Sequence, residues 1–250
     1  MIVAIILCNR TEAVSDGKPA YFPPLGEETA IERLIQVVAR GPFGGTLVAS
    51  AAPLAAEMRQ TLAGFTVQHV ELAPAAPGSV AELLPAFRAA EAFRGRWEKA
   101  HAAATGRFGG KQPEAEEGPD WKKLRGSADV RVRGLARSFD RDGVMLFRGD
   151  QPGLSLDVQA HLSEHFGRDA SASAAGLRTS YAGQPDYPVV LGLEAVREVL
   201  ALPPETLLDD WLAEQTARIK AVPVNNPGVT ERLLSDSAYR SVRAQMVQQN

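Results

Sequence analysis

The first eight residues constrain the fold of this chain more than any other feature of its sequence. Residues 2–7 are all aliphatic, and Cys8 closes the run before the polar pair Asn9 and Arg10. An unbroken apolar run of this length is typical of a strand that is covered on both faces of a sheet. No positively charged residue precedes the run, and it is far shorter than a membrane span. We therefore interpret it as a buried strand rather than a signal peptide.

Strand-like and helix-like segments alternate along the rest of the chain. Over the first 72 residues the order is strand, helix, strand, helix, strand, which predicts a parallel sheet with right-handed crossovers. The full pattern predicts an α/β fold with a mostly parallel central sheet and helices on both faces. We expect strands at residues 2–8, 46–49, 65–72, 144–147, 177–181, 188–191 and 219–224. We expect helices from Thr29, at 53–62, 79–105 and 127–138, from Ser155 or Asp157, at 193–201 and 205–217, and from Thr230.

One stretch interrupts this pattern. Residues 106–126 contain five glycines, two prolines and an acidic patch at Glu114, Glu116 and Glu117. This composition is typical of a segment that cannot bury a core of its own. We expect a flexible insertion here, within a single domain that spans residues 1–250.

Charge and cysteine content exclude several classes of function. The formal net charge is −3, with 27 basic and 30 acidic residues, which argues against non-specific binding to nucleic acid. The single cysteine excludes a disulfide framework and a cysteine-rich zinc site. No apolar stretch reaches the length of a membrane span. We therefore expect a cytoplasmic protein that binds neither nucleic acid nor a membrane.

The most informative polar residue is Asp150, which follows the expected strand at 144–147 in the sequence Gly149-Asp150-Gln151-Pro152. Ligands of open α/β sheets bind beyond the carboxyl ends of the parallel strands. A carboxylate held at that edge suits Mg²⁺, which prefers oxygen ligands and keeps substrate phosphates in its shell. The alternative is that Asp150 only caps a local turn, because aspartate is common in turns.

A second candidate is Lys18, in the loop that follows the first strand at residues 9–28. A lysine in this position can reach a triphosphate as a flexible point charge and stabilise a pyrophosphate leaving group. Arg10 in the same loop can act in the same way. The alternative for both residues is a solvated surface side chain.

Three segments, in this order, resemble the nucleotidyltransferases that mature the molybdenum cofactor, the molybdopterin guanylyl- and cytidylyltransferases. The first runs from the strand at 2–7 through Lys18 and Phe22-Pro23-Pro24-Leu25-Gly26 to the helix at Thr29. The second is Gly149-Asp150-Gln151-Pro152, which is similar to the family's metal-binding Gly-Asp-Gln-Pro. The third, residues 181–189, resembles its Gly-x-x-Gly-His-Pro-Val segment.

The resemblance implies a Rossmann-like, GT-A-like nucleotidyltransferase fold. It implies transfer of NMP from CTP or GTP onto a phosphorylated acceptor such as molybdopterin, with release of pyrophosphate. In that reading Asp150 binds Mg²⁺ and acts with Lys18 in catalysis. A molybdoenzyme maturation protein is the implied protein partner. The implied nucleotide-binding residues are Leu7, Cys8, Asn9, Arg10, Thr11 and Lys18.

The sequence also departs from the family's pattern, so its phosphate loop is degenerate. Asn9 and Ser15 stand where the family has glycine, and Ala13 stands where it has arginine. Loss of glycine restricts the approach of the backbone to phosphate, and loss of arginine removes a bidentate donor. Near the C-terminus, Leu234 takes the place of a metal-binding aspartate, and Asp236 lies two residues further on.

Three functions therefore remain open. The first is a working nucleotidyltransferase. The second is a non-catalytic relative that serves as a nucleotide- or partner-binding protein, which the missing glycines and arginine favour. The third is another GT-A-like transferase that uses an activated sugar.

Overall fold

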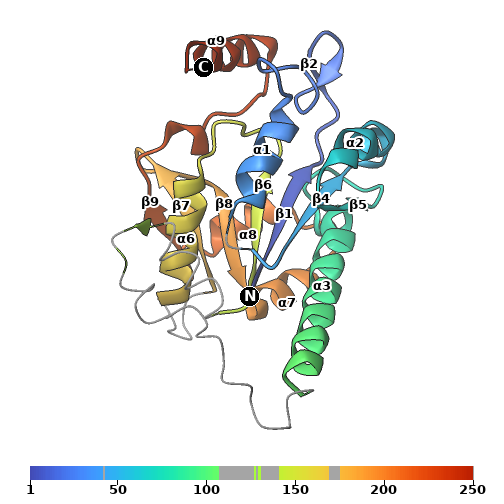
Figure 1. Ribbon diagram of the computed structural model, residues 1–250, viewed down its shortest axis with the longest axis vertical. Helices are drawn as coiled ribbons and strands as arrows, with labels where there is room; N and C mark the ends of the chain where they lie inside the picture. The colour runs from blue at the N-terminus through green and yellow to red at the C-terminus, as the bar shows by residue number, and fades with distance from the viewer. Residues whose placement is uncertain (42, 107–126, 128, 131–140, 169–174, 250) are drawn as a thin grey trace.

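The computed structural model describes residues 1–41, 43–106, 127, 129–130, 141–168 and 175–249. At its centre lies a seven-stranded sheet with the strand order β5-β4-β1-β6-β8-β7-β9 (Figure 1). Each neighbouring pair is parallel except the two pairs that involve β8. The predicted mostly parallel sheet is therefore confirmed. The strands are β1 (Ile2–Cys8), β4 (Gly45–Ser50), β5 (Gln68–Glu71), β6 (Gly143–Arg148), β7 (Gly176–Tyr181), β8 (Gln184–Gly192) and β9 (Ile219–Pro223).

Strand β1 lies inside the sheet, between β4 and β6, and all seven of its residues are buried. Alternate side chains enter two different cores. Ile2, Ala4 and Ile6 pack with α1 (Ala30–Ala39), α2 (Ala55–Thr61) and α6 (Leu156–Arg168). Val3, Ile5 and Leu7 pack with α3 (Val80–Gly106), α7 (Leu193–Leu200) and α8 (Leu208–Glu214) on the opposite face. The helices thus cover both faces of the sheet, as predicted.

Helix α1 follows from local signals in the sequence. Thr29 and Glu32 form a reciprocal capping box, in which the Thr29 hydroxyl accepts from the Glu32 backbone N–H. The apolar stripe of the helix is fully buried against the sheet, as its spacing predicts. Its members are Ile31, Leu34, Ile35 and Val38.

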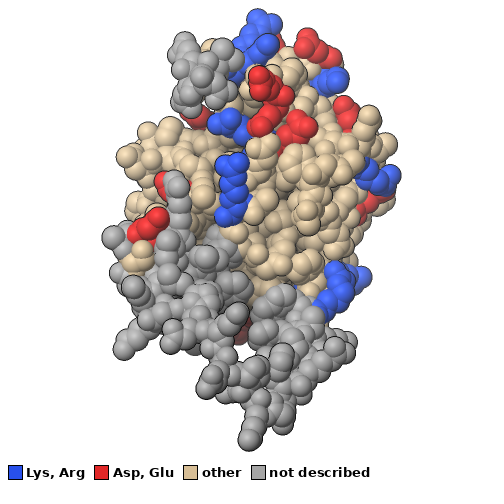
Figure 2. Space-filling model, viewed as in Figure 1, with Lys and Arg blue, Asp and Glu red and all other residues tan. Residues whose placement is uncertain are grey.

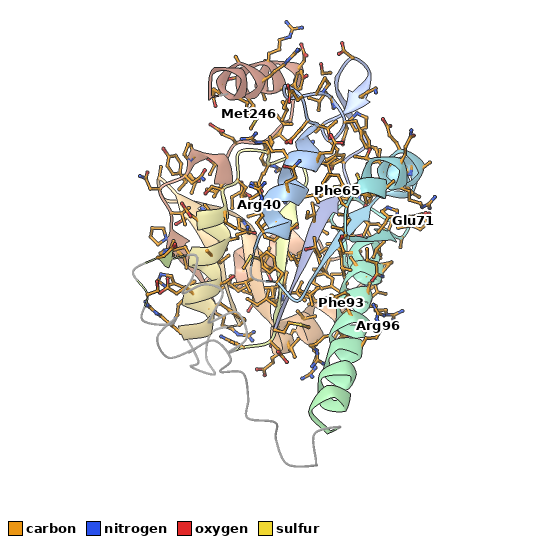
Figure 3. All side chains as sticks on the ribbon, viewed as in Figure 1. Arg40, Phe65, Glu71, Phe93, Arg96 and Met246 are labelled. Carbon is orange, nitrogen blue, oxygen red and sulfur yellow. The ribbon has the colours of Figure 1, made fainter. Side chains whose placement is uncertain are left out.

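A third, smaller core lies above the carboxyl edge of the sheet. There α9 (Asp236–Gln249) covers a hairpin formed by β2 (Ala13–Ser15) and β3 (Lys18–Pro19) (Figure 1). The Tyr239 hydroxyl donates to the carbonyl oxygen of Pro24 at 2.6 Å. Met246, labelled in Figure 3, belongs to this cluster. The helix therefore holds down the long loop after β1.

Several boundaries differ from the prediction. Strand β5 begins at Gln68 rather than residue 65, because a 3-10 turn at Leu62–Gly64 precedes it. Strand β8 begins at Gln184, and α9 begins at Asp236 rather than Thr230. The β2–β3 hairpin lies inside a segment predicted to be loop. Residues 107–126 lie outside the described part of the chain, as does most of the predicted helix at 127–138.

The described helices include none that is both long and apolar enough to cross a bilayer. Acidic and basic side chains are interspersed over the upper half of the face shown in Figure 2.

Candidate functional site

The turn after β6 holds Asp150 at the carboxyl edge of the sheet. The Gly149 N–H donates to the Leu7 carbonyl at 2.8 Å, which continues the pairing of β6 with β1. A Cβ atom at Gly149 would lie 2.5 Å from Cys8 Sγ and 3.0 Å from the Tyr21 ring, so glycine is required by close packing. Asp150 itself is only 2 % exposed. The sequence prediction of a rigidly held carboxylate after this strand agrees with this geometry.

The guanidinium group of Arg232 forms an ion pair with the carboxylate of Asp150. Its Nη2 lies 2.9 Å from Asp150 Oδ2, and its Nε lies 3.4 Å from Oδ1. The backbone fixes this pairing, since the Leu233 N–H donates to the Asp150 carbonyl at 2.9 Å. Gln151 adds a further bond, from Nε2 to the Val229 carbonyl at 2.7 Å. The charge of Asp150 is therefore already balanced by a guanidinium group.

This arrangement does not fit a divalent metal ion at Asp150. Both carboxylate oxygens face Arg232, which takes the positions that a cation would need. Within the described ranges, no group of three or more His, Cys, Asp or Glu residues could hold a metal. Asp236, two residues beyond the expected ligand position, pairs with Arg240 at the start of α9. Sequence reasoning missed the role of Arg232, which lies only two residues before Leu234.

Lys18 and Arg10 form their ion pairs with other residues, not with Asp150. Lys18 Nζ lies 3.8 Å from Glu57 Oε1 on α2, and both side chains are about half exposed. Arg10 Nε lies 3.5 Å from Glu12 Oε2, while its backbone N–H donates to the Tyr21 hydroxyl at 2.9 Å. In the described residues, no hydrogen bond or ion pair joins either cation to Asp150. The structure therefore places Lys18 on the α2 side of the loop and does not bring it into contact with Asp150.

Leu7 and Cys8 end β1 with buried side chains on opposite faces of the sheet. Burial raises the pKa of the Cys8 thiol well above its ordinary value, and the charge of Asp150 raises it further. The thiol is therefore protonated and packed against Gly149.

Asn9 and Thr11 line a pocket of about 350 Å³ beyond the carboxyl ends of β1, β4 and β5. Its floor contains a buried hydrogen bond from Asn9 Nδ2 to Glu82 Oε2, at 3.0 Å. The same Glu82 oxygen accepts from the Gly78 backbone N–H at 2.6 Å. The walls are small and apolar, and they come from the segments that follow β4 and β5. They are formed by Ala51, Ala52, Pro53, Ala73, Pro74, Ala75 and Pro77.

Glu82 is a functional candidate that sequence reasoning missed. Burial raises the pKa of its carboxyl group, while the hydrogen bonds from Asn9 and Gly78 oppose the rise. A signal for it was present, because Ser79 followed by Glu82 three residues later is the pattern of a capping box. In the structure the Glu82 N–H donates to the Ser79 hydroxyl at 3.3 Å. The capping interaction at Ser79 thus positions the Glu82 carboxylate in the lining of the pocket.

Comparison with known proteins gives a clear result for the fold. No family model matches the chain, and no curated protein matches it. Solved structures do match over nearly the whole length. A nucleotidyl transferase from Methanothermobacter thermautotroptrophicus is 17 % identical with a TM-score of 0.62, covering 100 % of this chain and 99 % of its own. The fold is therefore that of nucleotidyltransferases, with a Rossmann-like sheet.

Two further solved structures share this fold. Molybdopterin-guanine dinucleotide biosynthesis protein A from Archaeoglobus fulgidus is 12 % identical with a TM-score of 0.58, covering 99 % of this chain and 100 % of its own. Rv0371C from Mycobacterium tuberculosis, solved in complex with manganese, is 15 % identical with a TM-score of 0.59, covering 97 % and 98 %. At these identities the likeness establishes the shared fold. The resemblance noted in the sequence thus holds at the level of the nucleotidyltransferase fold.

Proposed function

We propose that this chain is a nucleotidyltransferase that moves NMP from CTP or GTP onto a phosphorylated acceptor such as molybdopterin and releases pyrophosphate. The observation that carries the proposal is the pocket of Asn9, Thr11 and Glu82 at the carboxyl edge of a nucleotidyltransferase sheet. Nucleotides bind at that edge in open α/β folds.

The chemistry of this pocket suits a nucleobase. Its alanine and proline walls offer flat apolar contacts to the faces of a base. The Glu82 carboxylate can accept hydrogen bonds from the amino groups that cytosine and guanine carry. Asn9 offers both a carbonyl oxygen and a second N–H to the same base edge, because its bond to Glu82 uses only one N–H.

In this proposal Thr11, Arg10 and Lys18, in the loop after β1, bind the phosphates of the nucleotide. The contact between Lys18 and Glu57 is long and exposed, so it stabilises the folded chain by about 0–1 kcal/mol at most. A triphosphate can therefore draw Lys18 away from Glu57 at little cost. An acceptor phosphate oxygen then attacks the α-phosphorus in line, the bond to the β-phosphate breaks, and pyrophosphate leaves.

No step of this proposal passes through a metal ion. A divalent ion is bound by the Mycobacterium tuberculosis relative in its manganese complex. In this chain, Mg²⁺ at Asp150 would require Arg232 to release both carboxylate oxygens first.

A specific observation favours the non-catalytic alternative. Arg232 binds both carboxylate oxygens of Asp150, so the expected metal-binding carboxylate is not free in this conformation. A nucleotide- or partner-binding protein needs the pocket but does not need a free carboxylate at Asp150.

Calorimetric titration with CTP, GTP and ATP, with and without Mg²⁺, tests the proposal. Ala75 lines the pocket and is exposed, so Ala75→Trp fills the pocket without disturbing the core. Ala76→Trp is the matched control, because Ala76 is an exposed neighbour outside the pocket lining.

We expect CTP or GTP to bind the unmodified chain and the Ala76→Trp variant, and to lose most of its affinity for Ala75→Trp. Equal binding to both variants would contradict the assignment of the pocket. Pyrophosphate release in the presence of a phosphorylated acceptor separates the two functions, since the non-catalytic relative binds nucleotide but releases none.

A further inference from the structure

A second pocket lies at the same edge, over β6, β8 and β7, and is closed on one side by α8. Its volume is about 240 Å³, and three arginines line it. They are Arg148 at the end of β6, Arg178 in β7 and Arg232 in the segment before α9. Buried guanidinium groups need counter-charges, which Asp209 supplies to Arg148 and Asp150 supplies to Arg232.

Arg148 is held in place by its neighbours. Its Nη2 pairs with Asp209 on α8, and its guanidinium carbon lies 4.3 Å from the centre of the Tyr187 ring. The Tyr187 hydroxyl donates to the other Asp209 oxygen at 2.8 Å. Each oxygen of the Asp209 carboxylate therefore accepts from one of these two partners. The Nε of Arg148 is buried and has no hydrogen-bond partner in the described part of the chain.

Arg178 is the least satisfied of the three arginines. Its Nε is also buried without a hydrogen-bond partner, and no ion pair within the described ranges involves its guanidinium group. A buried donor that is left unpaired costs about 1–3 kcal/mol, and more when it is charged. An oxyanion bound in the pocket would supply the missing acceptors for Arg178 and Arg148 together.

Two carboxylates line the pocket, Asp186 and Asp209, and Asp186, which forms no ion pair within the described residues, opposes an anion. Burial is the largest effect on its pKa and raises it, while the Tyr187 N–H, Arg232 and Arg148 act in the opposite direction. The Tyr187 N–H donates to Asp186 Oδ1 at 2.8 Å. Arg148 pairs with Asp209 and Arg232 pairs with Asp150, so Arg178 is the one guanidinium group of the lining that forms no ion pair within the described residues.

The two pockets are neighbours on one face of the sheet. The backbone between them is a short bridge that pairs Ser79, before α3, with Leu207, before α8. Val80 N–H donates to the Thr206 carbonyl at 2.8 Å, and Leu208 N–H donates to the Gly78 carbonyl at 2.9 Å. The segments before α3 and α8, the helices that supply Glu82 to the first pocket and Asp209 to the second, are therefore joined directly by backbone hydrogen bonds.

We propose that the pocket of Arg148, Arg178 and Arg232 binds the oxyanion of a small acidic acceptor, a phosphate monoester or a carboxylate. This inference rests on the proposed transferase function, for which it gives the acceptor a place and a chemical class. Arg178 is its specificity-determining residue, because a planar guanidinium group binds an oxyanion through two parallel hydrogen bonds.

Titration with small probes tests this inference without any nucleotide. Glycerol 3-phosphate offers a phosphate monoester, glycolate offers a carboxylate, and glycerol is the neutral control. We expect one of the two anions to bind and glycerol not to bind, and the anion that binds identifies the class. Arg178→Gln should weaken binding at least tenfold. Arg197→Gln, an exposed arginine on α7, makes the same charge change and should leave binding unchanged.

Arg178→Lys is a second variant, in case Arg178→Gln fails to fold. It keeps the positive charge but lacks the planar guanidinium group that forms two parallel hydrogen bonds. It should bind the anion more weakly than the unmodified chain while melting at a similar temperature. Equal binding by Arg178→Gln, or no binding of either anion to the unmodified chain, would overturn the inference.

The Ala75→Trp variant separates this outcome from failure of the proposed function. It should bind the anion normally and lose the nucleotide. Anion binding without any nucleotide binding would sustain this pocket and refute the transferase. Nucleotide binding without anion binding would refute the assignment of this pocket and leave the transferase proposal standing.

Discussion

Gly149 is the residue at which the packing of the site can be tested most simply. A methyl group there would meet Cys8 Sγ at 2.5 Å, inside a core that leaves little room to adjust. Gly149→Ala should destabilise the fold by about 1–3 kcal/mol, as overpacking does, when measured by urea denaturation. Gly95→Ala is the control, because nothing lies within 4 Å of that position in helix α3. It should be neutral or stabilise by up to about 1 kcal/mol.

Cys8→Ala in the Gly149→Ala background should recover part of that loss, because it removes the atom that the new methyl group meets. Independent, additive effects of the two substitutions would show that the contact with Cys8 is not the cause.

The pair of Asp150 and Arg232 makes a second prediction at this scale. Arg232→Met leaves a carboxylate that is 2 % exposed without its partner, and should cost roughly 3–5 kcal/mol of stability. Asp150→Asn together with Arg232→Met should cost less than the sum of the two single changes. A double-mutant cycle from urea denaturation measures this coupling. Strict additivity would mean that the ion pair is not formed in solution.

Glu82 links stability to pH. Its pKa in the folded chain is raised above the ordinary value of 4.5, chiefly by burial. The folded chain therefore holds this proton more tightly than the unfolded chain. The resulting stabilisation is complete below the ordinary pKa and is lost as the pH rises through the raised value.

Glu82→Gln keeps an acceptor for Asn9 and Gly78 but removes the titration. Its stability relative to the unmodified chain should therefore increase as the pH rises from below the ordinary pKa of 4.5 through the raised value. Thermal unfolding of both proteins, measured from below pH 4.5 upward, provides the test. Parallel curves would contradict the account of Glu82.

The residues of the site were predictable from the sequence to different degrees. The place of Asp150 followed from a buried strand and the turn after it, which are both local signals. Its partner Arg232 lies 82 positions away, and Glu82 lies 73 positions from Asn9. Contacts of this range depend on how the strands order in the sheet, which the periodicity of a segment does not determine. The roles assigned to Lys18, Arg10, Leu7, Cys8 and Thr11 remain predictions.

At the scale of elements, α9 determines how firmly the loop after β1 is held. Tyr239 is buried in the small core between the helix and the hairpin. Tyr239→Ala should open that core, so the amides of residues 13–25 should exchange faster with deuterium. The amides of β1 should be unaffected. Arg240→Ala, on the exposed side of the same helix, is the control. Unchanged exchange in the hairpin would show that the helix does not restrain the loop.

Elements with strong local signals were predicted well, and those set by distant contacts were not. Helix α1 has both a capping box and an apolar stripe. Strand β8 was expected to begin later, because Pro185 and Asp186 are typical of turns, yet they pair with β7. Helix α9 begins late because a 3-10 turn at Pro227–Val229 comes first, and Leu233 is then bound to Asp150. The turn of the missed hairpin, Asp16-Gly17, has positive φ at both residues.

At the scale of the whole molecule, the arrangement of strands brings the two pockets to one edge. The segments after β1, β4 and β5 line the first pocket, and residues of β6, β7 and β8 line the second. The sequence predicted the sheet because buried strands have a clear apolar signature. It did not predict the pockets, since their walls are alanines, prolines and arginines with no pattern of their own.

The most direct test of the central claim is an NMR titration of the chain labelled with nitrogen-15 only at asparagine. The four asparagines are Asn9, Asn225, Asn226 and Asn250. Asn9 reports on the pocket of Glu82, whereas Asn225 and Asn226 line a different pocket beside α6. If CTP or GTP binds as proposed, the side-chain amide signals of Asn9 shift and those of Asn225 and Asn226 do not. Shifts at Asn225 and Asn226 alone, or no shift with any nucleotide, would contradict the account.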